Sequence, residues 1–274
     1  MTLLALAVAG RGIVDPSTPV LHADDEGFLR GRAAFETTRV YAGRPFRLER
    51  HLERLEESAE RLGLTVPPRL DQLAAGAIRA AGPIDAFLRI YVTPGREGSG
   101  EPQALALVGE LPPDLDAMRA RGIALAGIPA GIDPPGLLGG VKSTSYAVNM
   151  VAVDEAKRRG ADDAVFLARD GIVLEGPTTN IWWRRGQTLH TPALELGVLA
   201  GVTREVIVEA APAAGYEVVE GTYRFDDLLQ SDEAFTSSSV REVMPVVQID
   251  GNRVGDGKPG PAARALQEAL RALT

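Results

Sequence analysis

Lys142 lies in the segment 139–146 (GGVKSTSY), between a Pro/Gly-rich loop at 133–140 and a stretch patterned as a helix. A lysine at this point is either an ordinary solvated charge at a helix start or an amine held in a pocket to form a Schiff base. For one lysine alone, solvation is the favoured interpretation. The decision therefore depends on the chemistry of the segments that follow.

Three later features supply complementary chemistry. Glu175 ends a hydrophobic strand and is followed by a turn of small residues. The segment 199–204 (LAGVTR) places a glycine and a hydroxyl at a helix start, where backbone N–H groups suit an anion. The run 237–239 (SSS) offers hydroxyls and turn amides for a second anion contact. Each alone has an ordinary explanation as a surface turn, a helix cap or a serine loop.

Together these groups match one cofactor. Pyridoxal phosphate requires an amine for a Schiff base, a carboxylate for its ring nitrogen and donors for its phosphate. The amine would come from Lys142 and the carboxylate from Glu175. The two turns would bind the phosphate.

Both halves of the chain must supply elements that position these residues. Apolar periodicity and turn signals predict many strands with interspersed helices, and two prolines at 112–113 interrupt the pattern. We therefore expect an α/β (α+β) chain with an N-terminal domain at 1–111, a linker at 112–121 and a cofactor-binding domain at 122–274. The expected strands are 3–9, 35–41, 45–48, 86–93, 103–110, 123–128, 164–168, 172–174, 181–184, 188–190, 216–220, 234–236 and 243–249. The expected helices are 49–62, 68–81, 146–159, 202–210, 225–229 and 261–273.

Composition excludes several classes of function. The 274 residues carry a net charge of -8, which argues against nucleic acid or an anionic membrane as the main partner. There is no cysteine, and the three histidines are too scattered for a zinc site. No apolar run is long enough to span a membrane, and the apolar start of the chain is better explained as a strand than as a signal peptide. We expect a cytoplasmic protein.

The motifs also resemble a known family, the class IV or fold-type IV pyridoxal-phosphate aminotransferases. This family includes D-amino acid aminotransferase, branched-chain aminotransferase and aminodeoxychorismate lyase. The resemblance runs from about Asp24 to Gly251. It rests on five motifs in the family's order: FETTRVYAGRPFRLERHLERL, VKSTSYAVNMVA, GIVLEGPTTNIWW, LAGVTRE and TSSSVREVMPVVQIDG.

The resemblance implies a two-domain fold like that of D-amino acid aminotransferase, a homodimer and a role for each matching residue. Lys142 would form the Schiff base (internal aldimine) and transfer protons as acid and base, and Glu175 would pair with the ring nitrogen. Tyr146 is a candidate partner for the ring oxygen, or a core tyrosine. The phosphate would be bound by Arg54, Val202, Thr203, Ser238 and Ser239. For Arg54 the alternative is a surface ion pair with Glu53 or Glu57.

The substrate carboxylate requires a cation or a nest of amide N–H groups, and arginine suits it best. The candidate substrate-binding residues are Phe35, Arg30, Arg32, Arg89 and Arg96. Where D-amino acid enzymes carry Gly-Asp-Gly, this chain has Gly31-Arg32-Ala33, and Arg89 resembles a strand arginine of the branched-chain type. We expect Arg30 or Arg32 to bind the carboxylate, unless both are surface or dimer-interface charges.

The lead prediction is a transaminase that exchanges amino groups between amino acids, favoured to be D-amino acids, and 2-keto acids. One alternative is aminodeoxychorismate lyase, which releases pyruvate and 4-aminobenzoate; Thr37 and Thr38 keep it open. The others are a branched-chain L-amino acid aminotransferase and a non-catalytic cofactor carrier. The pair of Lys142 and Glu175 argues against a carrier, which would not need an electron sink.

Overall fold

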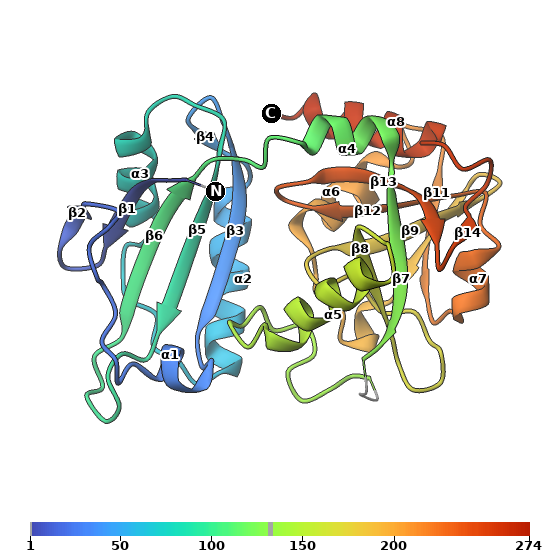
Figure 1. Ribbon diagram of the computed structural model, residues 1–274. Helices are drawn as coiled ribbons and strands as arrows, with labels where there is room; N and C mark the ends of the chain where they lie inside the picture. The colour runs from blue at the N-terminus through green and yellow to red at the C-terminus, as the bar shows by residue number, and fades with distance from the viewer. Residues whose placement is uncertain (1, 131–133) are drawn as a thin grey trace. The chain divides into compact units, whose positions relative to one another are not determined.

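The computed structural model describes residues 2–130 and 134–274, so Asp133 of the predicted loop lies outside the described residues. The chain forms two compact units (Figure 1). Unit one contains Met1–Pro112 and Val141–Tyr146, and unit two contains Pro113–Gly140 and Ala147–Thr274. The segment that carries Lys142 therefore belongs with the first part of the chain.

Unit one is built on an antiparallel sheet in the order β2-β1-β6-β5-β3-β4. Helices α2 (Leu48–Arg61) and α3 (Leu70–Ala81) cover one face of it (Figure 1) and bury an apolar core around Leu55 and Leu88. The short helix α1 spans Glu26–Arg30. The strands are β1 (Leu3–Val8), β2 (Gly12–Val14), β3 (Ala34–Tyr41), β4 (Arg44–Pro45), β5 (Ala86–Thr93) and β6 (Gln103–Gly109).

The buried face of α2 is unusually polar. The residues on it recur at helical spacing, but His51, Arg54 and Ser58 accompany Leu55 and Ala59. Arginine and histidine are seldom fully buried unless they have partners. This face therefore marks a polar cluster between α2 and the sheet.

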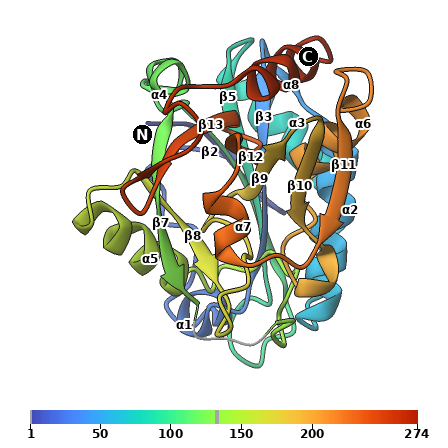
Figure 2. The same ribbon diagram turned by 90° about the vertical axis from the view of Figure 1, so that its right-hand side faces the viewer.

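Unit two contains a mixed sheet in the order β11-β10-β9-β12-β13-β7-β8, with β14 (Asn252–Arg253) paired to β13. Figure 2 shows β13, β12, β9, β10 and β11 side by side. Helices α6 and α8 pack over Trp182 and Phe235, and α5 packs against β7 and β8. The strands are β7 (Ile123–Pro129), β8 (Asp163–Leu167), β9 (Asn180–Arg185), β10 (Thr188–Pro192), β11 (Glu217–Gly221), β12 (Glu233–Ser238) and β13 (Glu242–Ile249). The helices are α4 (Leu115–Arg121), α5 (Ala147–Arg158), α6 (Val202–Ala210), α7 (Phe225–Leu229), α8 (Pro261–Arg271) and the 3-10 helix η1 (Leu194–Leu196).

The predicted mixed α/β class is confirmed, and the predicted bounds of α6 and α7 match the structure. Other local predictions differ from the structure. Of the expected strand at 45–48, only Pro45 lies in a strand, because α2 begins at Leu48. The expected strand at 172–174 forms only isolated bridges through Ile172 and Val173. The stretch expected to be a linker contains α4, and the sequence did not indicate α1 or β2, because such short elements carry too few residues to show a period. Among the described helices, none is both long and apolar enough to cross a membrane.

Candidate active site

The backbone around Lys142 is fixed by β3 and α2. The Phe35 N–H donates to the Lys142 carbonyl at 3.0 Å, and Ala34 forms a bridge with Ser143. The Lys142 N–H donates to Ser58 Oγ at 3.2 Å. The segment 141–146 thus runs antiparallel beside the start of β3, and Lys142 precedes helix α5 rather than opening it.

The Lys142 side chain lies against aromatic rings. Its Nζ is 4.5 Å from the centre of the Phe35 ring and 5.9 Å from that of Tyr146. The two rings contact each other edge to face at 5.2 Å. The lysine is half-buried, so its amine is partly removed from water and held by ring contacts. This is a suitable setting for an amine that reacts, and its Schiff-base role remains a prediction.

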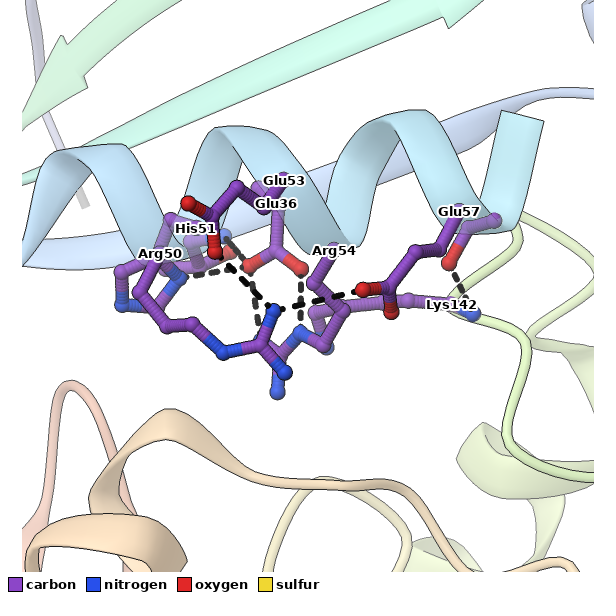
Figure 3. Close-up of polar contacts among 9 residues, drawn as sticks. Glu36, Arg50, His51, Glu53, Arg54, Glu57 and Lys142 are labelled. Atoms are coloured by element: carbon purple, nitrogen blue, oxygen red, sulfur yellow. Dashed lines mark hydrogen bonds and ion pairs between the residues drawn. The ribbon is translucent and has the colours of Figure 1, made fainter. Parts of the chain in front are cut away.

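Arg54 belongs to a buried ionic cluster (Figure 3). Its Nε and Nη2 donate to the two carboxylate oxygens of Glu36 on β3, at 2.6 and 2.8 Å. His51 Nδ1 lies 2.7 Å from Glu36 Oε2. The alternative of a surface ion pair for Arg54 is wrong, because the side chain is buried. Arg50 is the residue that contacts Glu53 and Glu57, each at 3.4 Å.

The charges of this cluster follow from its contacts. Burial opposes ionisation of Glu36, but the charge of Arg54 and the hydrogen bonds from His51 and Arg54 outweigh it and lower the Glu36 pKa to about 2. Burial is the largest effect on His51 and lowers its pKa. The charges of Arg54 and Lys142 act in the same direction, and together these three effects outweigh Glu36, which raises the pKa. At neutral pH His51 is therefore neutral, with Nδ1–H donating to an ionised Glu36.

Glu175 is held in place by the start of the α6 region. The Leu199 N–H and the Asn180 Nδ2 both donate to Glu175 Oε2, at 3.1 and 3.2 Å. Asn180 Nδ2 also donates to the Leu199 carbonyl at 2.8 Å. These two bonds hold the Glu175 carboxylate in place.

Asn180 brings together the three predicted motifs of unit two. It contacts Glu175, and it pairs across the sheet with Ser237, the residue before Ser238. It also lies against Gly201, where an added Cβ would come within 2.1 Å of Asn180 Oδ1. A glycine is therefore required at the N-cap of α6 by this close approach.

The two predicted phosphate turns present donors of the right kind. Gly201 caps α6 without a side-chain hydrogen bond, and the first helical residues Val202 and Thr203 are buried. In the second turn, Ser238 Oγ accepts from the Arg241 N–H at 3.3 Å. A fixed carboxylate, a helix N-terminus with no side-chain cap and a hydroxyl turn fit the donor set that pyridoxal phosphate requires.

The four candidate substrate arginines differ in what they already bind. Arg30 pairs with Glu97, and Arg96 pairs with Asp24. Both partners in each of these two ion pairs are exposed. The guanidinium of Arg32 donates to the carbonyls of Leu62 and Gly63 at the end of α2 and to Glu26 on α1. Arg89 stacks over Phe87, and its buried Nε has no hydrogen-bond partner within the described residues.

Arg89 also shares a sheet face with the environment of Lys142. It pairs across the strands with Thr37, and Phe35 pairs with and stacks on Tyr91, so side chains at 35, 37, 89 and 91 lie on one face. Lys142 contacts that same Phe35. The structure thus brings Arg89, Phe35, Tyr146 and Lys142 to one side of unit one.

Sequence reasoning missed Glu36, His51, Ser58 and Asn180. Glu36 and His51 lie within the first family motif, and Asn180 lies within the third. The spacing of His51, Arg54 and Ser58 on one helix face with Leu55 could have indicated a buried polar stripe. No local signal pairs Glu36 with them, because that contact comes from the packing of α2 on β3.

Comparison with known proteins identifies the family. Residues 33–249 match the model of the Amino-transferase class IV family. The bifunctional aminodeoxychorismate lyase / D-amino acid transaminase of Mycobacterium tuberculosis is 34% identical, over 88% of this chain and 90% of that protein. The branched-chain-amino-acid aminotransferase of Pseudomonas aeruginosa is 28% identical, over 89% and 82%.

A solved structure shows the same fold. A hypothetical aminotransferase from Mycobacterium tuberculosis, in its PLP-bound form, superposes with a TM-score of 0.90 at 31% identity and covers 98% of both chains. It has also been solved in an alpha-ketoglutarate and PMP bound form. The family match spans most of the chain and agrees with the donor set described above. The chain belongs to the class IV aminotransferases and is an enzyme that uses pyridoxal phosphate.

Proposed function

We propose that this enzyme is a transaminase for D-amino acids and 2-keto acids. The observation that carries the proposal is the half-buried Lys142, whose Nζ lies 4.5 Å from the Phe35 ring while its backbone is fixed by Ser58 and β3. The D-amino acid preference is supported by the relative that is named a D-amino acid transaminase and is 34% identical.

Each residue then has a defined task. When bound, pyridoxal phosphate draws electrons from the substrate Cα and carries the amino group. Lys142 holds the cofactor covalently and moves the proton to and from the substrate carbon. Glu175, fixed by Asn180 and the Leu199 N–H, keeps the ring nitrogen protonated. Tyr146 would contact the ring oxygen of the cofactor. The phosphate is bound by Arg54, Val202, Thr203, Ser238 and Ser239.

Arg89 is the candidate that we favour for the substrate carboxylate. Its buried Nε is unpaired among the described residues, whereas Arg30, Arg32 and Arg96 are paired with carboxylates on their own surface. An unpaired buried donor is costly and is satisfied by an incoming anion. Replacing Arg89 by methionine should raise the KM for 2-keto acids about tenfold or more. Arg32→Met should leave that KM unchanged, and the reverse result would assign the carboxylate to Arg32.

A second candidate function is the lyase reaction on aminodeoxychorismate, since the same relative is also named a lyase. The two reactions are separated by what happens to the cofactor. A transaminase passes the amino group to the cofactor in its first half-reaction and from the cofactor to a 2-keto acid in its second, whereas the lyase releases pyruvate and leaves the cofactor bound to Lys142. A branched-chain aminotransferase would differ from the D-amino acid enzyme in its substrate, which has the L configuration and a branched side chain.

The test mixes the holoenzyme with D-alanine, L-leucine and aminodeoxychorismate in turn. The cofactor absorbance and pyruvate release are recorded for each. Conversion to pyridoxamine phosphate by D-alanine but not L-leucine supports the proposal. Conversion by L-leucine alone indicates the branched-chain type, and pyruvate from aminodeoxychorismate without cofactor conversion indicates the lyase.

We retain the homodimer as part of the proposal. Phe28 and Leu29 on α1, and Val148, Met150 and Val151 on α5, expose apolar side chains. Such side chains on a water-exposed surface commonly mark contacts with another chain. Light scattering should give twice the mass of the chain, and a monomer would contradict the dimer.

A further inference from the structure

The turn between β12 and β13 is followed by a strained, buried glutamate. Glu242 opens β13 with a φ of +58°, in the left-handed region that usually takes glycine or asparagine. Its side chain is almost completely buried. Both properties cost stability, so the surrounding contacts must impose them.

The side chains of Arg119, Gln267 and Arg271 contact the Glu242 carboxylate. Arg119 on α4 donates from Nη2 to Oε2 at 3.0 Å, and Gln267 on α8 donates to the same oxygen at 2.8 Å. Arg271 on α8 places Nε 2.6 Å from Oε1 and Nη2 2.9 Å from Oε2. The charge is therefore compensated by two helices, neither of which belongs to the turn.

The same partners also hold the backbone on both sides of Glu242. Arg119 donates to the carbonyls of Arg241 at 3.0 Å and Val243 at 3.2 Å. The Val243 N–H donates to Gln267 Oε1 at 3.0 Å. The path of residues 241–243 is thus set by side chains from α4 and α8.

Arg241, the last residue of the turn, is anchored in a different direction. Its Nη1 donates to Asp163 at the start of β8, at 2.5 Å, and Asp163 is buried. Its N–H donates to Ser238 Oγ at 3.3 Å. Adjacent residues at the end of the turn are therefore tied to β8 on one side and to α4 and α8 on the other, which leaves the Ser238–Arg241 backbone little freedom.

We infer that Glu242 and Arg119 are positioning residues that hold the Ser238–Ser239 turn in the conformation that binds the phosphate of the cofactor. The inference rests on the proposed function, in which this turn binds the phosphate of the cofactor. Neither residue needs to touch the phosphate. Their bonds preset the turn, so that its hydroxyls and amides are in place before the anion arrives.

A second buried carboxylate, that of Glu233, serves as the comparison for a purely structural role. Glu233 opens β12 and is equally buried; it pairs with Arg184 and accepts from the N–H groups of Ala262 and Ala263 at the start of α8. It binds cations and amides as Glu242 does, but it lies at the other end of β12 from the serine turn. Glu233→Gln is therefore the matched control.

The experiment compares pyridoxal phosphate with pyridoxal, which lacks the phosphate. Cofactor is removed from the full-length chain and from the variants, and each compound is titrated while its covalent attachment to Lys142 is followed by absorbance. Glu242→Gln should weaken pyridoxal phosphate about tenfold or more and change pyridoxal less than about twofold. Glu233→Gln should lower the melting temperature similarly but change neither affinity selectively.

Equal weakening of both compounds by Glu242→Gln, or no change in either, would overturn the inference. Should Glu242→Gln not fold, Arg119→Met makes the same comparison, because Glu242 then keeps Arg271 and Gln267. The proposed function fails in a different way: the unaltered chain would attach neither compound at Lys142.

Discussion

Replacing Glu36 by glutamine tests the buried cluster under α2. The carboxyl has a pKa lowered from 4.5 to about 2 in the folded chain, by Arg54 and His51 against the effect of burial. A shift of this size corresponds to about 3 kcal/mol of stability at neutral pH. Glu36→Gln removes that contribution and leaves the buried guanidinium of Arg54 without the carboxylate, so the expected loss is about 3 kcal/mol.

The pH dependence has a definite sign. A carboxyl whose pKa is lowered by folding stabilises the protein fully above its unfolded pKa of 4.5, and the contribution is lost as the pH falls toward about 2. The unaltered chain should therefore lose stability through this range. Glu36→Gln has no proton to bind at this position, so its stability should fall less steeply there.

Unfolding by urea should be followed with two probes, because the chain has two units. Both tryptophans, Trp182 and Trp183, lie in unit two, so their fluorescence reports on that unit, whereas circular dichroism reports on both. The loss should appear in the dichroism transition. Glu57→Gln is the control: its exposed carboxylate contacts Arg50 at 3.4 Å, and its loss should cost less than about 0.5 kcal/mol.

A loss of stability in Glu36→Gln no larger than that in Glu57→Gln would refute this role of the Glu36 carboxylate, and so would an acid dependence equal to that of the unaltered chain. His51 gives a second readout. Its pKa is lowered by burial, so its contribution is present above the unfolded value of 6.5 and is lost as the pH falls below it. Since Glu36 opposes that lowering, the His51 pKa measured by NMR should fall further in Glu36→Gln.

Three further changes test the site. Lys142→Ala should abolish covalent attachment of pyridoxal phosphate, measured by mass spectrometry after borohydride reduction, and a retained adduct would assign the amine elsewhere. Asn180→Leu removes the bonds to Glu175 and the Leu199 carbonyl and should weaken cofactor binding about tenfold in an absorbance titration. An unchanged affinity would show that those bonds do not position the carboxylate. Gly201→Ala places a Cβ 2.1 Å from Asn180 Oδ1 and should cost about 1–3 kcal/mol in denaturant unfolding; an unchanged midpoint would show that α6 shifts freely.

Much of unit two could be predicted because its signals are local. The helix at 202–210 follows Gly201 and carries Thr203 in its first turn, and a tight turn at Gly186 joins the strands β9 and β10. In each case a few neighbouring residues determine the backbone. The motif around Glu175 was recognisable for the same reason, because its glycine and strand lie next to it in the chain.

The partners of these residues could not be predicted, because they come from packing. Glu36 reaches Arg54 only because β3 packs under α2, and Asn180 reaches Gly201 only because β9 runs beside the α6 start. Nothing in the residue types separates the buried Arg54 from the partly exposed Arg50, four positions earlier on the same helix. Spacing shows the face of a helix but not what covers it.

The substrate arginines show most clearly what residue type leaves undetermined. Arg30 and Arg32 stood out because relatives carry other residues there, yet each already donates to a carboxylate, and Arg32 also closes the end of α2. For these two arginines a substrate anion offers little gain, because binding it must first break their existing surface contacts. Arg89 lies in an apolar strand and drew less notice, but its buried Nε is unpaired among the residues that the structure describes. The capacity of an arginine to bind a carboxylate therefore follows from the hydrogen-bond donors that the fold leaves unsatisfied. The sequence pattern does not show which donors these are.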